Sequence, residues 1–60
     1  MSRTKRMLED LAEDVQQVMD DGLTFTDATI KVLIDKNIIA SKTEVDTINM
    51  YKSNIEAYIW

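Results

Sequence analysis

The stretch that decides the fold is TKRMLEDLAEDVQQVMDDGL, residues 4–23. Its apolar residues recur every three or four positions, which is the spacing of one face of an α-helix. Gly22 stands where a left-handed residue ends a helix, and Leu23 can fold back onto the last turn. The pattern predicts an amphipathic helix over about residues 4–21. The apolar face consists of Met7, Leu8, Leu11, Ala12, Val15, Val18 and Met19.

A second helix is predicted over about residues 25–36. Thr24 and Asp27 have the spacing of a capping box. Asn37 tolerates the left-handed conformation that ends a helix. The alternating β-branched residues between positions 30 and 34 are also compatible with a strand. The two helix-end signals favour the helix.

The third predicted helix covers about residues 42–58. Ser41 and Glu44 have the capping-box spacing, and Ala40 is placed to pack against Val45. Ile38 and Ile39 lie in the short link before it and are expected to fill the space between the second and third helices. The apolar stripe of this helix is Val45, Ile48, Tyr51, Ile55, Tyr58 and Ile59.

These segments predict an all-α protein with a single domain over residues 1–60. Three helices with short links form a small three-helix bundle, or a helical hairpin that is completed by oligomerisation. A chain of 60 residues has a small core. It contains no cysteine and no histidine, which excludes disulfides and the common structural zinc sites. We therefore expect no metal and no cofactor, and we expect self-association or a permanent partner to support the fold.

Charge and hydropathy narrow the expected partners. The net charge of −4 argues against general nucleic-acid binding, which requires clustered Lys and Arg. No apolar stretch reaches the roughly 20 residues of a membrane span. Acidic residues follow the basic start, where the apolar part of a signal peptide would lie. These features predict a soluble, cytoplasmic protein that does not bind membranes.

The carboxylates of the first predicted helix form one candidate binding surface. Side chains three and four residues apart line the same side of a helix. This side either faces solvent only or docks onto a basic partner. A calcium loop is excluded because Asp20, Asp21 and Gly22 lack the required alternation of ligands. The predicted acidic face is Glu9, Asp10, Glu13, Asp14, Asp20 and Asp21.

A second candidate surface is a seam for an oligomer or a partner. The first helix has basic residues at its start and acidic residues at its end, which opposes the helix macrodipole. Antiparallel pairing with a second copy would set each basic end beside an acidic end. Tyrosine and tryptophan side chains near the C-terminus are suited to anchor an interface or to fill a core. The predicted seam is Arg3, Lys5, Arg6, Tyr51, Tyr58 and Trp60.

Catalysis is not expected, because no nucleophile stands beside an evident base and no glycine-rich phosphate loop is present. The sequence favours a non-enzymatic protein–protein interaction module: an adaptor, inhibitor or regulatory protein that binds a partner protein and itself, with no small-molecule substrate. Its size and acidity resemble those of accessory proteins of phages and mobile elements that bind a host enzyme. Two alternatives remain open. One is a helix-turn-helix-like or antitoxin-like DNA-binding regulator that uses the basic N-terminus, and the other is a structural self-assembly subunit.

Overall fold

The computed structural model describes the backbone of residues 3–59 and the side chains of residues 7–59. Within that range the chain forms three α-helices: α1 (Arg3–Asp20), α2 (Phe25–Asp35) and α3 (Val45–Ile59). No strand occurs among the described residues. The all-α prediction is therefore confirmed, and the strand alternative for residues 30–34 is wrong.

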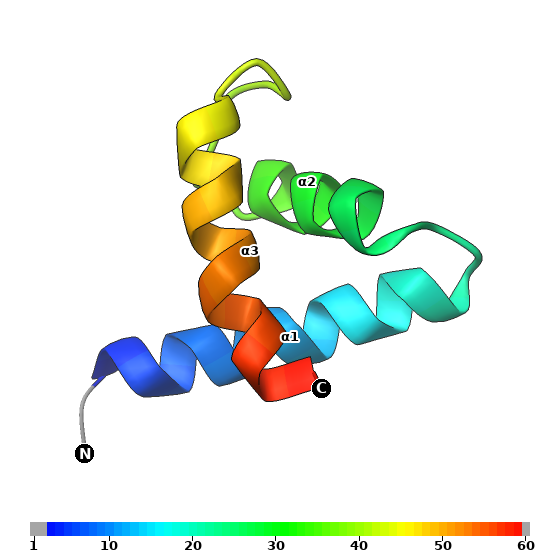
Figure 1. Cartoon of the computed structure of the whole chain (residues 1–60), viewed down its shortest axis with the longest axis vertical. Coiled ribbons are helices and arrows are strands. Elements are labelled where there is room, and N and C mark those ends of the chain that lie inside the picture. The colour runs from blue at the N-terminus through cyan, green and yellow to red at the C-terminus, as the bar shows by residue number, and fades with distance from the viewer. Residues whose placement is uncertain (1–2, 60) are drawn as a thin grey trace.

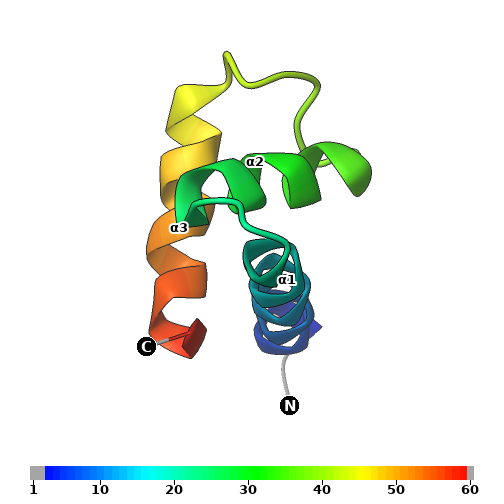
Figure 2. The ribbon, with the colours of Figure 1, turned by 90° about the vertical axis from the view of Figure 1, so that its right-hand side faces the viewer.

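The three described helices run in different directions and cross one another where they pack (Figures 1 and 2). α3 stands upright in both views, while α1 and α2 lie across it (Figures 1 and 2). The first half of α3 lies beside α2, and its C-terminal end reaches α1 (Figure 1). Each helix therefore contacts both of the others.

The core consists of two adjoining clusters of buried side chains. The first joins all three helices, and the second joins α2, the link and α3. Burial of an apolar side chain of this size contributes about 1.5–3 kcal/mol relative to exposure. The apolar face of α1 is confirmed from Leu8 to Met19, and so is the inward placement of Ile39, whereas Met7, the first residue of that face, is 44% exposed. The first cluster is Leu11, Ala12, Val15, Ala28, Val32 and Ile55, and the second is Leu33, Ile39 and Ile48.

Three further side chains depart from the predicted core. Val45 and Tyr58 were expected in the stripe of α3, but they are 56% and 38% exposed. Val45 is the first residue of α3, and Tyr58 lies on the flank of the buried stripe. Thr29 is fully buried although it was not expected in the core. Its hydroxyl donates a hydrogen bond of 2.8 Å to the carbonyl oxygen of Phe25, so burial leaves no polar group unsatisfied.

The turn between α1 and α2 forms as predicted. Gly22 adopts φ 109°, a backbone conformation that favours glycine. Its N–H donates to the carbonyl oxygen of Met19 at 2.9 Å. The Thr24 hydroxyl accepts a hydrogen bond of 3.2 Å from the backbone N–H of Asp27. These groups satisfy backbone atoms that a helix end leaves unpaired, which turns the chain sharply from α1 into α2.

The end of α2 is a Schellman motif with asparagine in the place of glycine. Asn37 has φ 60°, and its N–H donates to the carbonyl oxygen of Ile34 at 3.0 Å. The N–H of Ile38 donates to the carbonyl oxygen of Leu33 at 2.9 Å. This pair of hydrogen bonds defines the motif. It directs Ile38 against both core clusters, as the sequence predicted.

The conformation of Asn37 yields a first testable prediction. Asn37→Ala should lower the free energy of unfolding by about 1–2 kcal/mol, because an alanine side chain is strained in the left-handed region. Asn37→Gly should retain or raise stability, since glycine has no Cβ. Urea denaturation followed by circular dichroism measures both variants. Equal stability of the two would contradict the left-handed conformation.

The start of α3 differs from the prediction. The helix begins at Val45, not near residue 42. The Glu44 carboxylate accepts a hydrogen bond from the backbone N–H of Ala40, and the Ser41 and Thr43 hydroxyls lie 2.6 Å apart. The expected reciprocal capping box between Ser41 and Glu44 is therefore absent. Short polar side chains can bond nearby backbone in place of a helical turn, and here they form a turn before the helix.

Candidate interaction surface

The carboxylates of the predicted acidic face lie on the outside of α1. Five of the six are exposed, and Asp14 is half-buried. They occupy the side of α1 away from its buried residues, which pack against α2 and α3. Asp21 follows the last residue of the helix. The exposed members are Glu9, Asp10, Glu13, Asp20 and Asp21.

Asp14 has an intramolecular partner. Its carboxylate lies 2.9 Å from the Lys36 ammonium group, at the C-cap of α2. The hydrogen bond and charge of Asp14 raise the pKa of Lys36, and Asp10 and Asp35 add smaller contributions. The pair joins α1 to the end of α2, and it is the only ion pair among the described side chains. Asp14 is therefore less available to a partner than the other carboxylates.

The Lys36 pair predicts a pH dependence. Folding raises the Lys36 pKa above its ordinary value of 10.5. The pair therefore stabilises the fold fully below that pH, and the contribution is lost as the pH rises through the raised folded-state pKa. Wild type should exceed Lys36→Gln in stability at neutral pH, and the difference should narrow under alkaline conditions. Denaturation curves at several pH values test this, with Lys31→Gln on the same helix as control. A difference that is constant with pH would contradict the prediction.

The predicted seam is only partly within the described side chains. Tyr51 is half-buried and packs against both core clusters, whereas Tyr58 is exposed. Arg3, Lys5 and Arg6 belong to α1, but their side chains lie outside the described part, as does Trp60. α1 has no acidic residue in its first turn and no basic residue in its last, as predicted. The seam residues therefore do not form one described surface.

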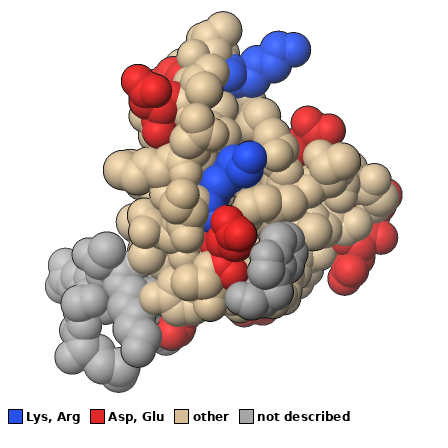
Figure 3. Space-filling view, in the orientation of Figure 1, with Lys and Arg blue, Asp and Glu red and all other residues tan. Residues whose placement is uncertain are grey.

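Basic charge is sparse in the described part of the chain. Residues 7–59 contain four lysines and no arginine. Two of these lysines are engaged internally: Lys36 pairs with Asp14, and the Lys52 ammonium group lies 5.9 Å from the centre of the Phe25 ring. Acidic side chains stand out at several places on the face in Figure 3, beside few basic ones. The described surface is therefore mainly acidic.

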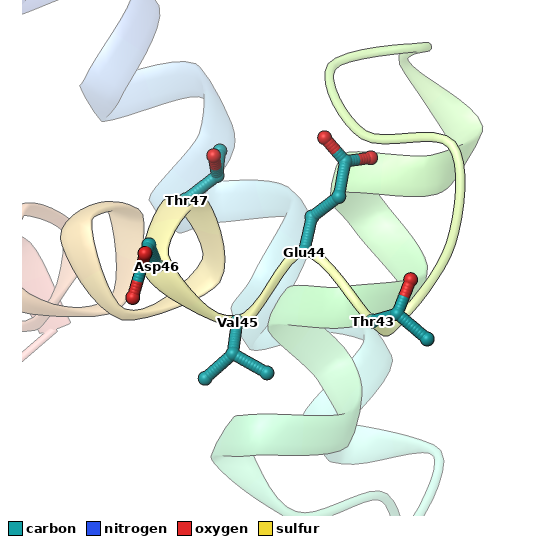
Figure 4. Close-up of a pocket in the computed structure, with 5 residues that line it drawn as sticks. All are labelled: Thr43, Glu44, Val45, Asp46 and Thr47. Carbon is teal, nitrogen blue, oxygen red and sulfur yellow. The ribbon is translucent and has the colours of Figure 1, made fainter.

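Two open depressions lie on the described surface. One of about 290 Å³ follows the start of α3, lined by residues 43–47. Figure 4 shows the side chains around it pointing in different directions, with no common focus. The other, about 240 Å³, lies between α1 and α2 beside the Asp14–Lys36 pair. The described residues bring no three potential metal ligands together. No described helix is both long and apolar enough to cross a membrane.

Sequence patterning missed one exposed feature of α3. Met50 was assigned to no surface, yet it is 54% exposed. Asn54 and Tyr58 follow it at intervals of four residues and are exposed as well. The available signal was the run Asp46, Met50, Asn54 and Tyr58 at four-residue spacing, in which only the first residue is charged.

No family model matches this chain, and comparisons with curated proteins and with solved structures find no match. The candidate surfaces in this fold are the exposed carboxylates of α1 and the exposed residues of α3.

Proposed function

We propose that this chain is a small acidic binding module that acts by docking the outer face of α1 onto a basic surface of another protein. The observation that carries the proposal is the exposed group Glu9, Asp10 and Glu13 on one helix. Lys36 forms its ion pair with Asp14. Among the described side chains, no ion pair neutralises the charge of Glu9, Asp10 or Glu13. Such a module acts as an adaptor, an inhibitor or a regulatory subunit.

Complementary charge gives this docking a defined physical signature. Opposite potentials accelerate encounter and select partners more than they add affinity. Salt screens charges on exposed side chains over about 10 Å at 0.1 M. Binding through α1 is therefore expected to weaken as salt is raised, with most of the change in the association rate.

The geometry of α2 and α3 supports a protein partner over DNA. A helix-turn-helix joins its two helices through a turn of about three or four residues. Here the link covers residues 36–44, which is longer. The lysine of α3, Lys52, lies over the Phe25 ring, and Asp46 and Glu56 add negative charge to the same helix. α3 therefore offers little positive charge to a phosphate backbone.

Two variants with the same net charge test the proposal. The first carries Glu9→Gln, Asp10→Asn and Glu13→Gln, and retains Asp14 so that the Lys36 pair remains. The control carries Asp27→Asn, Asp46→Asn and Glu56→Gln, which are exposed carboxylates of α2 and α3. Each variant changes the net charge from −4 to −1, since three carboxylates are neutralised.

Each immobilised protein is exposed to nuclease-treated bacterial lysate, and the retained proteins are identified by mass spectrometry. We expect one dominant protein that is retained by the wild type and the control and lost with the α1 variant. If both variants lost the retained protein equally, binding would depend on total charge and not on the outer face of α1. The absence of any enriched protein would overturn the proposal for that lysate.

A further inference from the structure

The open depression between α1 and α2 adjoins the acidic face, because Asp14 belongs to both. Its volume is about 240 Å³. Sites that hold whole small molecules measure roughly 300–1,000 Å³, so this depression suits a single side chain of a docked protein better. Its lining consists of Asp14, Gln17, Val18, Val32, Asp35 and Lys36.

The lining of this depression combines apolar and acidic groups. Val18 is half-buried and Val32 is buried, and they supply its apolar part. Gln17 and Asp35 are exposed beside them. A side chain with an apolar stem and a charged end matches this combination, because the stem covers apolar surface while the charged end stays in water.

The charges around the depression favour a cation. Its lining contains two carboxylates and one ammonium group, and the ammonium group of Lys36 lies 2.9 Å from Asp14. Besides Asp14, the charges of Asp10 and Asp35 help to raise the pKa of Lys36, so both act on a cation at this place. Asp35 forms no ion pair among the described side chains. Asp35 is therefore the carboxylate that is available to a second cation.

We infer that this depression receives an arginine side chain of the protein that docks onto α1, with the guanidinium group paired to Asp35 and the alkyl stem against Val18. The inference rests on the proposed function, because the arginine belongs to the docked protein. It adds a defined position and a defined chemistry to that contact. Lys36 keeps its pair with Asp14, so the incoming group displaces no existing interaction.

Arginine suits the depression better than lysine does. A guanidinium group is planar and presents two parallel N–H donors to one carboxylate. It is also more weakly hydrated than an ammonium group, so it loses less on contact with protein. The Gln17 carboxamide oxygen, on the other wall of the depression, is an acceptor for a further N–H.

Three small probes test the chemistry of the occupant. Nα-acetylarginine amide, its lysine counterpart and its citrulline counterpart, in which a neutral urea replaces the guanidinium group, are titrated into the full chain at low salt. Backbone amide resonances are followed by NMR. We expect the arginine probe to shift the resonances of Val18 and Asp35 in a saturable manner, more strongly than the lysine probe, and the citrulline probe to leave them unchanged. Equal shifts with the lysine or citrulline probe, or shifts that spare the depression, would overturn the inference.

Asp35→Asn tests the acceptor. It should weaken binding of the arginine probe by about two- to five-fold, as expected for the loss of an exposed ion pair. The variant should remain folded, because a negative charge at the C-terminal end of a helix is unfavourable. Asp27→Asn is the matched control, since it removes the same charge from α2 outside the depression. Equal weakening by the two variants would overturn the role of Asp35.

Gln17→Glu tests the same position by a gain of affinity. It adds a carboxylate to the lining of the depression and should strengthen binding of the arginine probe. Gln16→Glu adds the same charge to the neighbouring exposed position of α1, which does not line the depression. An equal gain with both variants would show attraction by total charge and would overturn the inference.

The lysate experiment separates this inference from the proposed function. If the arginine probe binds the depression and no protein is retained from lysate, the arginine site is supported and the docking proposal is overturned for that lysate. If a protein is retained through Glu9, Asp10 and Glu13 but the probe does not bind, the docking proposal is supported and the arginine site is overturned.

Discussion

Ile55→Ala lowers the free energy of unfolding by about 2–5 kcal/mol, the range for a large aliphatic side chain removed from a core. Ile55 is fully buried and is the only α3 residue among the buried members of the cluster that joins the three described helices. A chain of 60 residues has a total stability of about 3–9 kcal/mol. The variant is therefore expected to lose a large part of its stability, as measured by urea denaturation at a fixed protein concentration.

Val45→Ala is the matched control for this substitution. Val45 belongs to the same helix but is 56% exposed. Its truncation should change stability by less than about 0.5 kcal/mol, as for most surface positions. If Ile55→Ala lowered the free energy of unfolding as little as Val45→Ala, the burial of Ile55 would not be what holds α3 against the other helices.

Ala28→Leu is expected to destabilise the fold by about 1–3 kcal/mol through overpacking. Ala28 is fully buried in the cluster where α1, α2 and α3 meet, beside larger side chains such as Leu11 and Ile55. Alanine and leucine both favour helices strongly, so the substitution changes packing more than helix propensity. Thermal and urea unfolding measure the loss.

Ala40→Leu adds the same atoms at an exposed position in the link. It should leave the unfolding transition almost unchanged. If Ala28→Leu stabilised the protein instead, there would be unfilled space around Ala28. The tight packing of the three described helices at this position would then be contradicted.

Local patterns in the sequence were enough to place most of the helices. The apolar spacing of α1 predicted its buried face, with Leu11, Ala12 and Val15 inside. The ends of α1 and α2 were also predictable, because Gly22 and Asn37 act through their own backbone conformations. The start of α3 was placed too early, since the Glu44 carboxylate bonds to Ala40 and not to Ser41. Two local hydrogen-bonding schemes were available to that turn, and the spacing of the residues did not distinguish them.

The candidate surfaces were predictable only in part. The exposed positions of Glu9, Asp10 and Glu13 follow from the helical period alone. The ion pair of Asp14 could not be predicted in this way, since Lys36 is distant in the sequence and approaches Asp14 only when α2 packs on α1. The same applies to Met50, whose exposure depends on which side of α3 packs against α1 and α2.

The sequence by itself determined where the chain is helical, where α1 and α2 end and which face of α1 is apolar, because those features depend on residues within a few positions of one another. Only the tertiary structure decided that Thr29 is buried, that Asp14 is paired and that Met50 and Tyr58 are exposed together. These outcomes depend on how the helices cross, and a crossing is selected by the packing of side chains from all three at once.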